Sequence, residues 1–91
     1  MKSIIQSEKE CFFCHTTKYL ERHHVFGGIN RKNSEDDGAV VYLCAYHHRG
    51  YLGVHFNAPL SLVLKKKAQE EWEKRYGDRS AFIARYGRSY L

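Results

Sequence analysis

Cysteine and histidine residues occur in this chain at spacings that suit a metal ion. Two pairs, Cys11-Phe-Phe-Cys14 and Cys44-Ala-Tyr-His47, each have two residues between their members. A structural zinc ion takes four thiolate or imidazole ligands in a tetrahedron, which a fold often supplies as two close pairs. We therefore predict a structural zinc site whose ligands are Cys11, Cys14, Cys44 and His47. His48 is the alternative fourth ligand, but the two-residue spacing favours His47.

These cysteines have two other interpretations. In the first interpretation, the three cysteines are buried thiols that bind no metal. Two independent pairs at the same spacing seldom arise by chance, which speaks against it. The second is attachment of c-type haem, because the pattern Cys-x-x-Cys-His occurs at residues 11–15. A haem requires export and a distal ligand, and it leaves Cys44 and His47 unexplained. We therefore expect His15 to be a solvated turn residue.

A further group of histidines has the chemistry of phosphodiester hydrolysis. That reaction needs an activated water, a cation at the phosphate oxygens and help for the leaving alkoxide. A neutral imidazole accepts the proton of the water, and other imidazoles bind a divalent ion. His23 and His24 are adjacent, so on a strand they would face opposite sides. We favour a catalytic role for His23, His24 and His48 over the alternative in which one histidine packs and another is solvated.

The N-terminal half must position these residues. Residues 1–10 are expected to form a loose lead-in, and residues 19–26 and 39–43 are predicted to be strands because they are apolar or β-branched and bounded by turn residues. Residues 27–38 are rich in Gly, Asn, Ser and Asp, which predicts a loop with a basic tip. Residues 44–49 are predicted to form a short helix.

Two helices are predicted in the C-terminal part. Asn57 caps the first, which ends at Gly77, and Asp78 caps the second, which ends at Gly87. An apolar residue recurs every fourth position in the first helix, which predicts one core-facing stripe. The stripe consists of Leu60, Leu64, Ala68, Trp72 and Tyr76.

Length and composition agree with a small α+β domain. The 91 residues predict one domain, residues 1–91, with a core at about residues 11–57 and helices at about residues 58–87. The net charge of +5 suggests a polyanionic partner such as DNA. An odd number of cysteines, no signal-peptide pattern and no apolar run of about 18 residues predict a cytoplasmic chain with reduced thiols and no membrane partner.

The order of these motifs resembles a known family. Cys-x-x-Cys, His-His-Val, Gly-Gly and Leu-Cys-x-x-His-His over residues 11–48 resemble HNH endonucleases of the ββα-metal, or His-Me finger, type. The later pattern is similar to phage-encoded HNH proteins, in particular to the RecA-dependent nuclease family called Ref. The resemblance implies a zinc-stapled ββα-metal core with C-terminal helices that cleaves DNA using Mg²⁺ or Mn²⁺, with low sequence specificity. It suggests a recombinase filament or a phage packaging protein as a partner.

The resemblance also implies residue roles. His24 would be the general base, and His23 and His48 would hold the catalytic divalent ion. His55 would either join the active site or contact phosphate. The central Asn of the family is missing here, because the corresponding region reads Asp-Asp-Gly-Ala at residues 36–39. The candidates to replace it are Asn30, Asn33 and Asp37.

Basic residues elsewhere are candidates for phosphate contacts. The nucleic-acid-binding residues that we predict are Arg31, Lys32 and Arg49, while a solvated helix face is the preferred interpretation of the Lys65-Lys66-Lys67 run. Such contacts fix position and raise affinity but do not read sequence. The alternative function is a non-catalytic zinc-binding module that docks on DNA or on a protein. It explains the cysteines and the charge, but not the histidines outside the zinc site.

Overall fold

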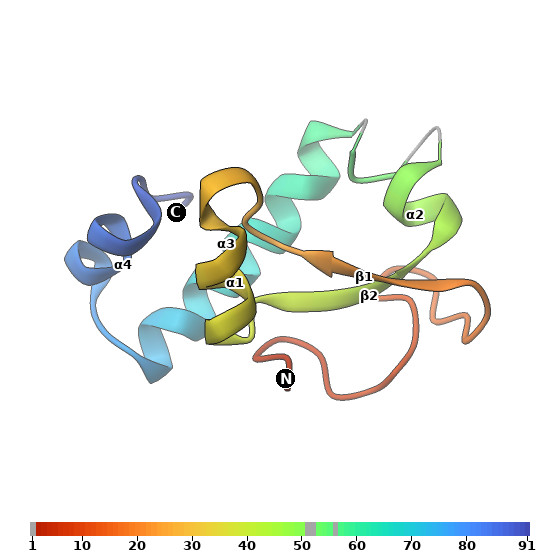
Figure 1. Ribbon diagram of the computed structural model, residues 1–91, viewed down its shortest axis with the longest axis horizontal. Coiled ribbons are helices and arrows are strands. Elements are labelled where there is room, and N and C mark those ends of the chain that lie inside the picture. The colour runs from red at the N-terminus through yellow and green to blue at the C-terminus, as the bar shows by residue number, and fades with distance from the viewer. Residues whose placement is uncertain (1, 51–52, 56) are drawn as a thin grey trace.

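An antiparallel pair of strands, β1 (Leu20–His24) and β2 (Val40–Cys44), lies at the centre of the computed structural model, which describes residues 2–50, 53–55 and 57–91 (Figure 1). The helical segments are η1 (Gly28–Asn30), α1 (Arg31–Asp37), α2 (Ala45–Arg49), α3 (Ala58–Arg75) and α4 (Arg79–Tyr86). The result is a small mixed fold of a two-stranded sheet and helices, which agrees with the predicted class. None of the helices in the described part of the chain has the length and apolar run that crossing a bilayer requires.

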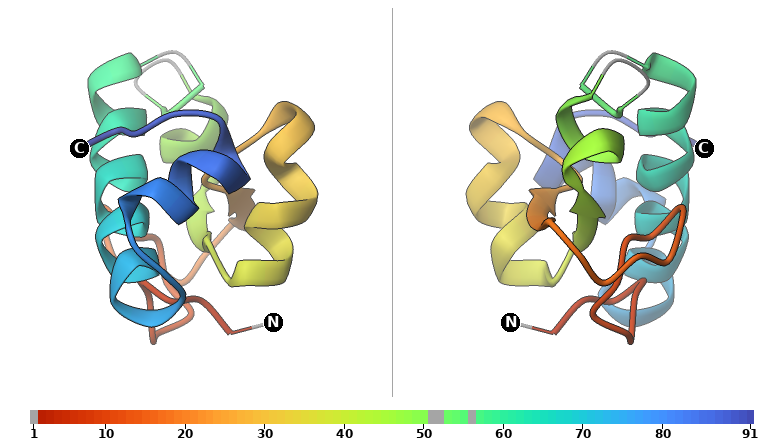
Figure 2. Two further views of the ribbon diagram at one scale, coloured as in Figure 1. Left: turned by 90° about the vertical axis from the view of Figure 1, so that its left-hand side faces the viewer. Right: turned by 90° about the vertical axis from the view of Figure 1, so that its right-hand side faces the viewer.

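The two faces of the sheet have different neighbours. His23 pairs with Val41 and His24 pairs with Val40, so the two histidines project to opposite faces, as predicted. In the side views, α1 and α3 lie on opposite sides of the strands (Figure 2). The side chains of His23 and His24 thus leave β1 on opposite faces of the sheet.

The predicted loop at residues 27–38 is wrong, because η1 and α1 occupy most of it. Ser34 is fully buried, and its Oγ accepts a hydrogen bond from the Phe26 amide (3.2 Å) and donates one to the Ala39 carbonyl (2.5 Å). Gly38 ends the helix in the left-handed conformation at φ 78°. Tertiary contacts therefore stabilise a helix in a segment whose residues individually favour turns.

The expected lead-in at residues 1–10 has no helix or strand in its described part, but it is not loose, since Ile4 lies in the core and Gln6 binds β2. Ile4 is buried in the core, and its amide donates to the Gly38 carbonyl (2.9 Å). The Tyr42 amide donates to Gln6 Oε1 (2.8 Å), and the Phe12 amide donates to the Tyr42 carbonyl (3.0 Å). Gln6 and Phe12 thus provide hydrogen-bond partners for the amide and the carbonyl of Tyr42, on the edge of β2 that faces away from β1.

The predicted helix caps are confirmed. Asn57 Oδ1 accepts from the Leu60 amide (3.1 Å), and Asp78 Oδ1 accepts from the Ala81 amide (2.9 Å). Within the predicted stripe of α3, the middle three residues are buried, whereas Tyr76 is 53% exposed. The helix ends at Arg75, before Tyr76 and the predicted stop, so the last position of the stripe lies beyond it.

Asp37, at the end of α1, contacts both α3 and α4. Its Oδ2 accepts from Trp72 Nε1 (2.8 Å), Arg85 Nε (2.6 Å) and the Tyr86 hydroxyl (2.7 Å), and its Oδ1 accepts from Arg85 Nη2 (2.8 Å). Burial alone would raise the pKa of Asp37, but these donors outweigh it and lower the pKa below its ordinary value. One carboxylate thus connects α1 to both C-terminal helices.

Candidate functional site

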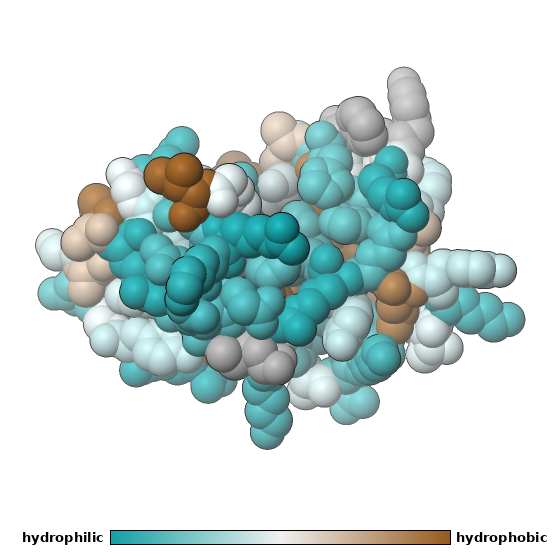
Figure 3. All heavy atoms as spheres, in the orientation of Figure 1, coloured by the Kyte–Doolittle hydropathy of each residue, from teal (hydrophilic) through white to brown (hydrophobic). Residues whose placement is uncertain are grey.

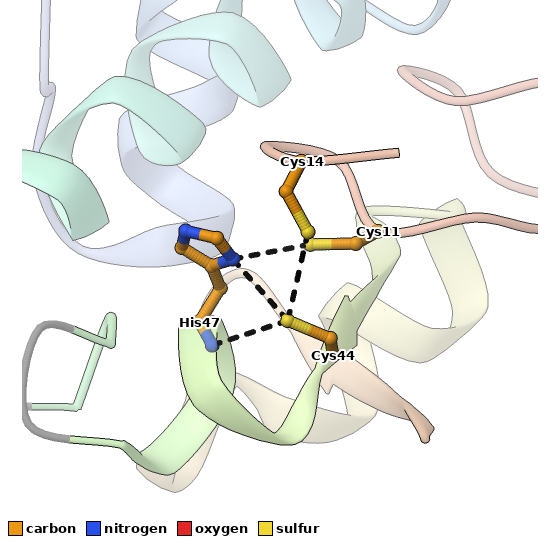
Figure 4. A group of neighbouring side chains, drawn as sticks. All are labelled: Cys11, Cys14, Cys44 and His47. Carbon is orange, nitrogen blue, oxygen red and sulfur yellow. Dashed lines mark hydrogen bonds between the residues drawn. The ribbon is translucent and has the colours of Figure 1, made fainter. Parts of the chain in front are cut away.

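The four predicted zinc ligands converge in space (Figure 4). Their ligand atoms all lie within 4.8 Å of one another. The Sγ atoms of Cys14 and Cys44 are 3.8 Å apart, and His47 Nδ1 lies 3.6 Å from Cys11 Sγ and 3.2 Å from Cys44 Sγ. The two distant pairs thus form one cluster that contains His47, not His48, while zinc binding by these residues stays a prediction.

These distances fit a tetrahedral ion. With Zn–S bonds of about 2.3 Å and Zn–N bonds of about 2.05 Å, a tetrahedron has S···S edges of about 3.8 Å and S···N edges of about 3.6 Å. Two of the observed separations match these edges, and the third is shorter by a few tenths of an ångström. The cluster could therefore hold a metal ion such as zinc.

Local backbone geometry prepares this cluster. Cys44 is the N-cap of α2, and its Sγ accepts from the His47 amide at 3.4 Å. Burial acts to raise the pKa of Cys11, but hydrogen bonds from backbone amides outweigh it and lower the pKa to about 6, which favours the thiolate that binds metal. His15 is not part of this cluster. Its Nδ1 lies 2.6 Å from Glu10 Oε2, and its side chain is 73% exposed. That position suits a turn residue, not a haem ligand.

A second cluster consists of histidines from three segments. His23 on β1, His48 on α2 and His55 in the following turn place their ligand atoms within 4.8 Å of one another. His48 Nε2 lies 3.1 Å from His55 Nε2, and the rings of His23 and His48 are 5.1 Å apart between centroids. His55, for which spacing alone left two roles open, therefore joins the two predicted ligands of the catalytic ion.

The turn after α2 brings His55 into this cluster. The Val54 amide donates to the His47 carbonyl (2.9 Å), and the His55 amide donates to the His48 carbonyl (3.3 Å). At Gly53 the chain passes so close to α2 that a Cβ atom would lie 2.8 Å from the Tyr46 carbonyl oxygen. Glycine is needed here because no side chain fits in that space.

A carboxylate orients His48. Glu21 Oε1 accepts from His48 Nδ1 at 2.7 Å, which leaves Nε2 facing the other two imidazoles. Arg49 Nε donates to both oxygens of Glu21, at 2.9 and 3.0 Å. Hydrogen bonds from Arg49 and then His48 lower the pKa of Glu21 and keep it ionised. Glu21 was not among the predicted site residues, although it lies two residues before His23 and so shares its face of the strand.

Another carboxylate holds His24 on the opposite face. Glu35 Oε1 lies 2.8 Å from His24 Nε2, and Glu35 Oε2 accepts from Arg22 Nη2 at 2.6 Å. The hydrogen bond from His24 is the main reason that the pKa of Glu35 is lowered. Glu35 was not among the predicted site residues, because the helix that presents it was predicted to be a loop.

The candidates for the missing Asn of the motif have other partners. Asn30 Nδ2 donates to the Tyr86 carbonyl (3.0 Å), and Asn33 Nδ2 donates to the Arg85 carbonyl (3.2 Å). Asp37 binds the side chains of the C-terminal helices. In the hydrogen bonds of the described residues, Glu35 is the side chain that meets His24.

Both histidine groups open into one groove of about 390 Å³. Its ionisable lining consists of basic residues and imidazoles: Arg22, Arg31, Lys65, His23, His24, His48 and His55. None of the described lining residues is Asp or Glu. Burial lowers the pKa of His23 to about 4, and the charges of His48 and His55 act in the same direction. His23 is therefore neutral near pH 7, which is the form that binds a metal ion.

The predicted nucleic-acid-binding residues lie in different surroundings. Arg31 lines the groove, whereas Lys32 pairs with Asp36 (2.7 Å) outside it, and Arg49 pairs with Glu21. Contact of these residues with DNA stays a prediction. The chain matches no protein-family model, no curated protein and no solved structure.

Proposed function

We propose that this chain is a metal-dependent DNA endonuclease of the HNH type. The observation that carries the proposal is the imidazole trio, whose ligand atoms lie within 4.8 Å of one another and which lines a groove without described acidic residues. A phosphodiester is an anion, and such a groove attracts it. In this proposal the Cys11, Cys14, Cys44 and His47 cluster holds a structural zinc ion and keeps β2 and α2 in place under the trio.

The trio would hold the catalytic cation through His23, His48 and His55. A divalent ion supplies charge stabilisation at the phosphoryl oxygen and at the leaving oxygen. Imidazole nitrogens favour Zn²⁺, Ni²⁺ or Co²⁺, whereas Mg²⁺ favours oxygen ligands. We therefore expect Mn²⁺ and the later transition metals to support cleavage better than Mg²⁺, although the family resemblance implies Mg²⁺ or Mn²⁺.

His24 would be the general base. A carboxylate only accepts hydrogen bonds, so Glu35 assigns the ring proton of His24 to Nε2. The other nitrogen, Nδ1, is then an acceptor for the proton of an attacking water. Glu35 thus orients the imidazole in the manner that a carboxylate orients a catalytic histidine in hydrolases.

Plasmid nicking by the purified protein tests this proposal. The assay compares wild type with His24→Ala in the presence of Mg²⁺, Mn²⁺, Co²⁺, Ni²⁺ or Zn²⁺, with His15→Ala as the control for loss of an exposed histidine. We expect metal-dependent nicking by wild type and His15→Ala, and a loss of about 100-fold or more in His24→Ala. Equal nicking by His24→Ala would refute the role of the base. DNA binding without cleavage by any metal would support the alternative, a non-catalytic zinc-binding module.

A further inference from the structure

Three consecutive lysines on α3 have different surroundings. Lys65 is partly buried and lines the groove together with Ser61, which precedes it by one turn and shares its helix face. Lys66 and Lys67 are exposed and are not among the lining residues. The expectation that the whole run is a solvated helix face therefore does not fit Lys65.

Lys65 is also positioned differently from Arg22, Lys32 and Arg49. Its Nζ lies 5.4 Å from the centroid of the Tyr90 ring, a cation–π distance. Arg22, Lys32 and Arg49 each pair with a carboxylate within 2.7 Å. In the described part of the chain, Lys65 forms no such ion pair. Its charge is therefore available to an anion in the groove.

Arg31 is a second groove-lining cation without a carboxylate partner among the described ion pairs, and it lies on α1, across the strands from α3. Its side chain is exposed. The helices that carry Arg31 and Lys65, α1 and α3, lie on opposite sides of the strands (Figure 2), so the two cations belong to different walls of the groove. Hydrophilic residues also cover the surface over α1 and β1 (Figure 3).

We infer that Lys65 and Arg31 bind phosphates on either side of the one that the imidazoles reach. The inference rests on the proposed function and assigns two residues that position its DNA substrate, since a strand, unlike a mononucleotide, has flanking phosphates for both cations. The contacts are to phosphate and read no base, so they give affinity and position without sequence preference.

Binding of a labelled DNA duplex at several salt concentrations tests this inference. The measurements use a His24→Ala background, so that the DNA stays intact, and compare Lys65→Gln with its neighbours Lys66→Gln and Lys67→Gln. Loss of one phosphate contact reduces the slope of log affinity against log salt concentration by about 0.9. Relative to 1 M salt, this change weakens binding about eight-fold at about 0.1 M salt. We expect this change for Lys65→Gln and for Arg31→Gln, and no such change for the two neighbours.

The outcomes separate the inference from the function on which it rests. If Lys65→Gln keeps the slope of Lys66→Gln while the wild-type protein nicks DNA, the inference is wrong and the endonuclease proposal stands. If all three lysine variants lose the same affinity, general surface charge is responsible and the inference is again wrong. If the parent protein binds no DNA and wild type nicks none, both are wrong.

Discussion

Replacement of Asp37 by alanine should destabilise the fold strongly. The side chain accepts four hydrogen bonds, from Trp72, Arg85 and Tyr86, in a buried position. Alanine leaves these donors without an acceptor, and breaking a buried ion pair in this way costs about 3–5 kcal/mol. A domain of this length has a free energy of unfolding of only about 5–14 kcal/mol. We therefore expect Asp37→Ala to lose at least about a fifth of the free energy of unfolding, and most of it if that free energy is near about 5 kcal/mol.

Urea unfolding followed by tryptophan fluorescence measures this loss. Trp72 is the only tryptophan and donates directly to Asp37, so its emission reports on this part of the core. Asp36→Asn is the matched control, because Asp36 pairs with a lysine that is 85% exposed and such a pair contributes about 0–1 kcal/mol. Asp37→Asn should lie between them, at about 1.5–3 kcal/mol, since it keeps an acceptor but loses the charge.

The same variants have a defined pH dependence. The pKa of Asp37 is lowered in the folded state, so its contribution is fully present above the unfolded pKa of about 3.9 and is lost as the pH falls through the folded value. The stability difference between wild type and Asp37→Asn should therefore shrink below about pH 4. Unfolding of Asp37→Ala at the same urea concentration as Asp36→Asn would refute the reasoning.

Three further predictions concern the two candidate metal clusters and the turn after α2 that carries His55. If the Cys11, Cys14, Cys44 and His47 cluster holds zinc, Cys44→Ser should lose the metal and unfold at 25 °C, because structural zinc contributes about 10–16 kcal/mol, which is comparable to or larger than the whole stability of such a domain; metal analysis and circular dichroism measure this. Glu21→Gln should weaken Co²⁺ binding at the imidazole trio about 10–100-fold in calorimetry, because His48 loses its orienting carboxylate; an unchanged affinity contradicts this. Gly53→Ala should displace His55 and reduce Co²⁺ affinity at the trio in calorimetry, since the added Cβ meets the backbone of α2 at Tyr46 and His47; an unchanged affinity contradicts this.

Local patterns in the sequence were enough for part of this structure. The two pairs of candidate metal ligands follow from spacing, because each pair spans one turn and brings its own donors together. Asn57 and Asp78 were recognisable as caps because a cap depends on residues only two or three positions away. The opposite faces of His23 and His24 follow from the alternation of a strand.

Only the tertiary structure decided which distant residues complete the site. Residues 31–37 form a helix because buried Ser34 and Asp37 find partners elsewhere in the fold, and that helix carries Glu35 to His24. Lys65 differs from its two neighbours because one face of α3 meets the groove. The sequence alone determined the types of donor and their local geometry, whereas the path of the chain determined which of them meet. The physical reason is that spacing acts over one turn or one strand, while contacts between distant residues depend on how the whole core packs.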